Sequence, residues 1–129
     1  YVVEFARHGK GGVCVEHLLT HTSGLPLVDG SVLPLTPNED PDAAWARVVA
    51  SICDEPPAHP PGACCMYSDA AFVILGELVS RVDGRPFPLY IREEVFLPLD
   101  LVDCHIGMDH SAFLRYAEED RIAPLTTQG

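Results

Sequence analysis

Prolines divide this chain into short segments and so limit what it can fold into. The sequence holds 12 prolines in 129 residues, roughly twice the usual share, and they concentrate at positions 26–41 and 56–61. Proline fixes its own φ, has no N–H to donate and cannot continue a helix or a central strand. We therefore expect loops over 26–39 and 55–66, with regular structure between them.

Apolar spacing predicts helices in the remaining segments. Asp40-Pro41 is a strong helix start, because aspartate is a favoured N-cap and proline suits the first turn. Apolar residues follow at intervals of three and four, including Trp45, and a longer stripe runs to Val82, before Gly84. The expected helices cover Val15–His21, stopped by Gly24 as a left-handed terminator, then Asp40–Glu55, Ser68–Asp83 and Pro86–Phe96.

The last part of the chain predicts little regular structure. We expect a short strand or extended piece over Cys104–Met108, a helical turn over Phe113–Glu118 and an extended piece over Arg121–Leu125. The expected fold class is α+β, mostly helical, with little strand to build a sheet.

Charge excludes several classes of partner. Eight Lys and Arg against 19 Asp and Glu give a net charge of −11, so we expect no nucleic-acid partner, because phosphates need cations. The one lysine, Lys10, provides no basic patch for an anionic membrane. No apolar run reaches the roughly 18 residues of a membrane span.

The cysteines predict no metal or redox motif, because they are odd in number and form no C-x-x-C. We expect small buried apolar side chains, with a disulfide among some of them as the alternative. The odd count slightly favours a cytoplasmic location over secretion. The five are Cys14, Cys53, Cys64, Cys65 and Cys104.

Motifs for metals, nucleotides and nucleophiles are weak. His17 and His21 would share one helix face, as in zinc hydrolases, but Leu18 stands where those enzymes carry glutamate. The alternative is that one histidine is a hydrogen-bonded helix-end residue and the other is exposed. Nucleotide-binding glycine loops and the G-x-S-x-G elbow are missing from the sequence, and no serine is followed by lysine three positions later. We therefore expect no metal site, no cofactor site and no nucleophile in this chain.

Tyr67 is the residue whose local sequence indicates chemistry. It precedes Ser68, the expected N-cap of the 68–83 helix, and Asp69 suits the positive end of the helix dipole. That positive end favours a negative charge nearby, so the phenol could act as a general base. The alternative is a tyrosine packed as a hydrophobic staple before the helix.

Ten consecutive residues resemble a known family. Residues 17–26, HLLTHTSGLP, resemble the signature of serine β-lactamase-like proteins, which include class C β-lactamases, D,D-peptidases and esterases. Residues 61–84 are similar to its PG…YSD…LG…G segment, and residues 98–101, PLDL, to its PLGL. Asp100 replaces the family's glycine after a helix end, and aspartate can take the left-handed conformation at modest cost.

The resemblance implies a partial β-lactamase-like domain over residues 1–129, mainly the helical subdomain with little of the antiparallel sheet. The family's S-x-x-K motif normally lies just upstream of this stretch, and its K-T-G or H-x-G motif well downstream. His105-Ile106-Gly107 fits H-x-G by its letters but follows residues 98–101 too closely. The chain therefore resembles an internal piece of the hydrolase.

The family's chemistry implies a function and two catalytic residues. The parent protein would be a serine hydrolase that forms an acyl-enzyme from a small-molecule ester, amide or lactam, without metal or organic cofactor. Tyr67 would be the general base, and Asp69 would take the position of the family's Asn. Aspartate keeps an acceptor but loses two donors, which favours esterase and peptidase branches.

Two alternatives stay open at this point. Asp69 is otherwise a favourable first-turn charge. The chain is otherwise a non-catalytic homologue or a helical binding or structural domain, and a Ser-x-x-Lys in the coding sequence before Tyr1 would favour the enzyme.

Overall fold

The computed structural model describes residues 1–28 and 39–122, and these residues form helices, turns and loops without a strand. The prediction of a mostly helical fold is confirmed. The short strand expected at Cys104–Met108 is absent, and turns and bends occupy this stretch. A lone strand would leave its ladder hydrogen bonds unmade, since the described residues offer no partner strand.

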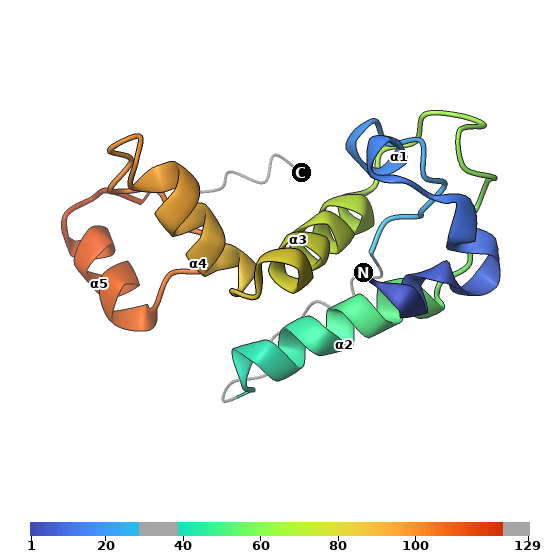
Figure 1. Ribbon diagram of the computed structural model, residues 1–129. Helices are drawn as coiled ribbons and strands as arrows, with labels where there is room; N and C mark the ends of the chain where they lie inside the picture. The colour runs from blue at the N-terminus through green and yellow to red at the C-terminus, as the bar shows by residue number, and fades with distance from the viewer. Residues whose placement is uncertain (29–38, 123–129) are drawn as a thin grey trace, which may run out of the picture. The chain divides into compact units, whose positions relative to one another are not determined.

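The chain divides into two compact units, Tyr1–Phe87 and Pro88–Gly129. The first unit contains the 3₁₀ segment η1 (Val3–Gly12), kinked near Gly9, and the helices α1 (Val15–Leu19), α2 (Pro41–Asp54) and α3 (Asp69–Asp83) (Figure 1). The predictions for α2 and α3 are confirmed to within one residue at each end. The predicted loop over 55–66 is confirmed, whereas most of the other, positions 29–38, lies outside the described residues.

The prediction for α1 is wrong at its end. This helix stops at Leu19, and His21 already has a left-handed backbone with φ of +56°. Thr20 is the C-cap, and its hydroxyl donates to the Glu16 carbonyl at 2.7 Å, which closes the last turn. Gly24, with φ of +78°, therefore serves a later turn and does not terminate the helix.

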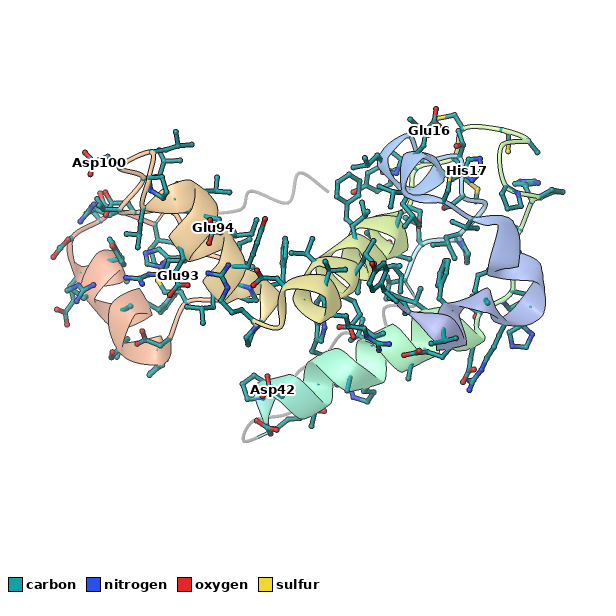
Figure 2. The ribbon with its side chains drawn as sticks, viewed as in Figure 1. Glu16, His17, Asp42, Glu93, Glu94 and Asp100 are labelled. Atoms are coloured by element: carbon teal, nitrogen blue, oxygen red, sulfur yellow. The ribbon has the colours of Figure 1, made fainter. Side chains whose placement is uncertain are left out.

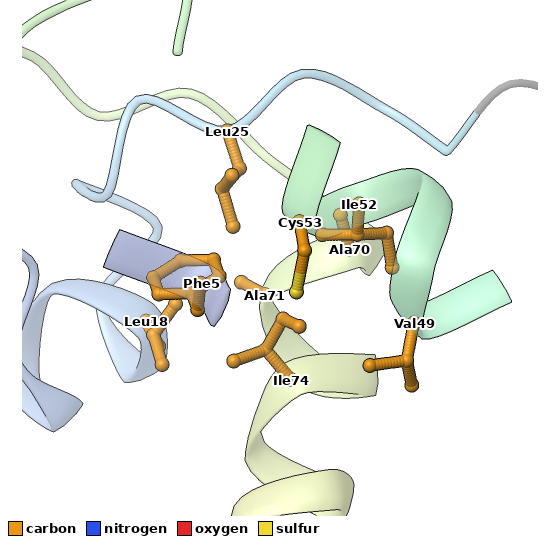
Figure 3. Close-up of a cluster of buried hydrophobic side chains, with 9 residues drawn as sticks. All are labelled: Phe5, Leu18, Leu25, Val49, Ile52, Cys53, Ala70, Ala71 and Ile74. Carbon is orange, nitrogen blue, oxygen red and sulfur yellow. The ribbon is translucent and has the colours of Figure 1, made fainter. Parts of the chain in front are cut away.

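The core of the first unit joins all its helical segments (Figure 3). The buried side chains of α3 fall mainly in its first two turns, so Val82 near its end is 57% exposed, contrary to the apolar stripe. Trp45 on α2 is also exposed, and its Nε1 donates to Glu77 Oε2 at 2.6 Å. The core consists of Phe5, Leu18, Leu25, Val49, Ile52, Cys53, Ala70, Ala71 and Ile74.

The side chains of Lys10 and Arg81 link η1 to α2 and α3. The buried Lys10 ammonium donates to the carbonyls of Cys53 at 2.9 Å and Glu55 at 2.5 Å, which satisfies the end of α2, and burial lowers the pKa of Lys10. Arg81 of α3 pairs with Glu4, and hydrogen bonds from its guanidinium lower the pKa of Glu4 to about 2.

The second unit contains most of α4 (Phe87–Ile91), the π-helical η3 (Arg92–Phe96) and α5 (His110–Glu118) (Figure 1). The predicted helix over Pro86–Phe96 is thus present, but its second half widens into a π turn. Asp100 has the left-handed φ of +56° expected from its place in the PLDL motif.

The helical turn predicted at Phe113–Glu118 is longer than expected, because Asp109 caps α5 by accepting from the Ala112 N–H at 2.9 Å. Of the extended piece predicted at Arg121–Leu125, positions 123–125 lie outside the described residues, and positions 121–122 belong to no helix or strand.

The prediction of buried cysteines is right for Cys53 alone. The other four thiols are exposed and all five are free, so the alternative of a disulfide is also absent. The physical reason is position, because the exposed thiols lie in connecting segments, which run over the surface. Within the described residues, no helix is long and apolar enough to cross a membrane.

Gly24 lies against the backbone of the loop over 55–66. The Ala58 N–H donates to the Gly24 carbonyl at 2.8 Å. A Cβ on Gly24 would stand 2.0 Å from the His59 carbonyl oxygen, far inside van der Waals contact. Gly24 thus has two reasons to be glycine, its positive φ and this close approach.

We predict that Gly24→Ala destabilises the fold by about 2–5 kcal/mol, the sum of left-handed strain and overpacking. Gly84→Ala is the matched control, because Gly84 has φ of +90° with nothing near its Cβ position, and its cost is about 1–2 kcal/mol. Denaturant unfolding measures the stability of both variants. Equal losses of stability would contradict the close approach of Gly24 to the His59 carbonyl.

Candidate active site

Backbone hydrogen bonds bring the two sequence motifs together. The Gly62 N–H donates to the Thr22 carbonyl and the Met66 N–H to the His21 carbonyl, both at 2.8 Å. These bonds run from the loop over 55–66 to the segment that follows α1. As a result, the two motifs lie side by side although they are far apart in sequence: residues 61–69 lie against residues 17–26.

Ser68 is the N-cap residue of α3, as predicted, but its hydroxyl does not cap the helix. The hydroxyl donates instead to the Pro26 carbonyl at 2.8 Å, and the Ser68 N–H donates to His21 Nδ1 at 3.3 Å. Ser68 is fully buried. Its side chain therefore fixes the start of α3 to the end of the HLLTHTSGLP segment.

Asp69 adds a second tie at the same place. Its Oδ1 accepts from the Val28 N–H and from the Ala70 N–H, both at 2.9 Å. One carboxylate oxygen thus joins the first turn of α3 to the backbone beyond Pro26. The negative charge also lies at the positive end of the α3 dipole, where it is stabilising.

Tyr67 directly precedes these anchored residues and is 66% exposed. Its ring centroid lies 4.9 Å from that of His21, with the planes tilted by 40°, and His21 also contacts Phe72 at 5.3 Å. Tyr67 therefore directly precedes a hydrogen-bonded helix start, with one histidine ring against it and most of its surface exposed.

The two histidines predicted to share a helix face do not form a pair, because α1 ends before His21. His17 lies on α1 (Figure 2). Its Nδ1 is 3.3 Å from the Cys14 backbone nitrogen and 3.4 Å from the Cys14 Sγ. His21 Nδ1 faces Ser68. Across the part of the chain that the structure describes, no group of three or more His, Cys, Asp or Glu could hold a metal.

His105 lies in the other unit. Its Nε2 is 3.4 Å from the Tyr116 hydroxyl, which donates to Asp103 Oδ1 at 3.0 Å. Hydrogen bonds from Arg121 and Tyr116 lower the pKa of Asp103. His105 is thus part of a local packing network around a buried tyrosine.

Sequence reasoning missed the role of His21 beside Tyr67. The residue belongs to the HLLTHTSGLP stretch, but periodicity alone assigned it to a helix face. The sequence does offer one signal that the helix ends before His21. This residue lies between two β-branched residues, Thr20 and Thr22, which weaken a helix at that point.

Comparisons with known proteins identify the family of this chain. A family model described as Beta-lactamase matches residues 1–125. A crystal structure of a penicillin-binding protein homologue from Caulobacter crescentus superposes with a TM-score of 0.68 at 32% identity, over 96% of this chain and 30% of that one.

Two curated relatives are similar in sequence. Protein Rv1367c of Mycobacterium tuberculosis is 34% identical over 128 residues, covering 88% of this chain and 30% of the relative. An Escherichia coli protein named "Putative D-alanyl-D-alanine carboxypeptidase" is 28% identical over 110 residues, covering 81% of this chain and 23% of the relative. The chain thus spans less than a third of the length of these proteins, and over that span it belongs to the beta-lactamase family.

Proposed function

We propose that this chain is the helical part of a longer serine hydrolase that cleaves an ester, amide or lactam through an acyl-enzyme. The observation that carries the proposal is the exposed Tyr67 at the anchored start of α3, held against the HLLTHTSGLP segment. Membership of the beta-lactamase family supports it, as does the similarity to a relative named for carboxypeptidase activity.

In the proposed mechanism a serine outside this chain attacks the substrate carbonyl. The serine proton passes to Tyr67, acting as general base with a lysine beside it, and then to the leaving group. Backbone N–H groups stabilise the oxyanion, and water releases the acyl group by the same proton route. None of these steps calls for a metal or an organic cofactor.

The lysine in this mechanism is also supplied from outside the chain. Lys10 is the one lysine of the sequence, and its buried ammonium already donates to two backbone carbonyls at the end of α2. A lysine held in this way stabilises the fold. The proposal therefore requires a Ser-x-x-Lys in the rest of the protein, and a full coding sequence without one would favour a non-catalytic homologue.

Asp69 takes the place of the family's Asn in this proposal. Because its Oδ1 already accepts two backbone N–H groups, contact with the substrate falls to Oδ2, which can only accept when ionised. An acceptor suits a substrate group that donates a hydrogen bond and does not suit a bare carbonyl. This favours peptide substrates, whose amide N–H can donate, over lactams.

The main test removes the Tyr67 hydroxyl. In the full-length protein, Tyr67→Phe is expected to lower turnover by at least ~10²-fold, the lower end of general-base contributions. The ring still packs against His21, so the free energy of unfolding is expected to change by less than ~1 kcal/mol. Near-full turnover of the true substrate would show that Tyr67 only packs, and unfolding would show that its hydroxyl is structural.

A second prediction concerns the isolated 129-residue chain. Incubated with an activated ester and with a chromogenic β-lactam, it is expected to show no acyl-enzyme mass shift, because none of its serines has an activating lysine. The full-length protein is the positive control. A stoichiometric adduct on a serine of this chain would mean that the nucleophile has been misplaced.

The third prediction separates the two roles of Asp69. Asp69→Ala removes the Oδ1 acceptor of two N–H groups and is expected to cost about 1.5–3 kcal/mol of stability. Asp69→Asn keeps an Oδ1 acceptor, so its loss of stability is expected to be the smaller, while its added donors improve turnover of β-lactams relative to esters. Unfolding curves and the two turnover rates measure this, and equal destabilisation by both variants would contradict the geometry.

A further inference from the structure

His21 holds a backbone conformation that most side chains avoid. Its φ of +56° is left-handed, where a non-glycine residue pays a steric cost. Such residues persist only where surrounding contacts hold them, and they cluster at functional sites. Here the holding contact is the Met66 N–H, which donates to the His21 carbonyl at 2.8 Å.

The left-handed turn places the imidazole beside the start of α3. Nδ1 accepts the Ser68 N–H at 3.3 Å, one of the donors that a helix start leaves without a helical partner. In a capping box, a glutamate side chain performs this task from within the helix. In this chain a histidine performs it from another segment, 47 residues away in sequence.

The same ring also packs on two aromatic side chains. The His21 centroid lies 4.9 Å from that of Tyr67 and 5.3 Å from that of Phe72, both tilted by about 40°. His21 therefore contacts the residue before Tyr67 through its carbonyl, Tyr67 itself through its ring and the residue after it through Nδ1.

We propose that His21 is the positioning residue of Tyr67, fixing the direction of the phenol for the proton transfers of the proposed function, on which this inference rests. Because Nδ1 accepts an N–H, Nε2 is the ring nitrogen left to donate. His21 does not itself touch the reacting atoms. Its effect on turnover passes through the orientation of Tyr67.

A double-mutant cycle in the full-length protein tests this coupling. His21→Ala is expected to lower kcat by ~10- to 100-fold, as misplacement of a catalytic group by about 1 Å can do, with little change in KM. In a Tyr67→Phe background the same substitution is expected to change kcat by less than ~2-fold, since the group it positions is already gone. A purely structural role would lower kcat equally in both backgrounds.

Two further variants keep the cycle interpretable. His21→Asn preserves an acceptor near the position of Nδ1 and tolerates a positive φ. It is therefore expected to fold even if His21→Ala does not, and to have a higher kcat than His21→Ala. His17→Ala is the matched control, because that histidine contacts Cys14, and it is expected to leave kcat unchanged. Equal kcat losses for His17→Ala and His21→Ala would overturn the inference.

A crystal structure of the His21→Ala or His21→Asn protein separates this inference from the proposed function. We expect the Tyr67 ring to be displaced, and an unmoved ring would contradict the positioning role whatever the kinetics. If Tyr67→Phe alone keeps full turnover while the ring moves in the His21 variant, the proposed function fails and the structural role of His21 stands.

Discussion

The close passage of Gly24 against the carbonyl of His59 is the constraint on which the first unit depends. Only a residue without Cβ can come this near, since a Cβ would lie 2.0 Å from the oxygen. The contact allows three backbone hydrogen bonds at 2.8 Å between the loop over 55–66 and the segment after α1. A proline-rich loop, which has few N–H groups to offer, is thereby held by the few that it has.

The arrangement of the candidate site follows from this close approach of Gly24 to His59. The loop that it fixes leads directly to Tyr67, and the next two residues are bound by Pro26 and Val28 on the other segment. The Lys10 ammonium holds the point where the same loop leaves α2. The exposed phenol thus stands on backbone fixed at both ends of the loop, as the proposed proton transfer through Tyr67 requires.

Local sequence predicted those parts whose cause is local. The α2 and α3 boundaries follow from Pro41, Ser68 and Gly84 and from apolar spacing, and the left-handed Asp100 follows from its place in PLDL. The resemblance of residues 17–26 and 61–84 identified the family correctly. What sequence could not give are the contacts between distant segments. The Ser68 hydroxyl donates to Pro26 rather than to its own helix, and the His21 ring acts on α3 rather than on α1.

The central claim is that this segment supplies Tyr67 to a serine held elsewhere in the protein. The most direct measurement is a crystal structure of the full-length protein inactivated by a serine-reactive phosphonate. The account predicts an adduct on the serine of a Ser-x-x-Lys, with the Tyr67 hydroxyl about 2.6–3.2 Å from the serine oxygen, within hydrogen-bond reach. An adduct on another serine, or a Tyr67 hydroxyl beyond the reach of a hydrogen bond or one bridging water, would contradict it.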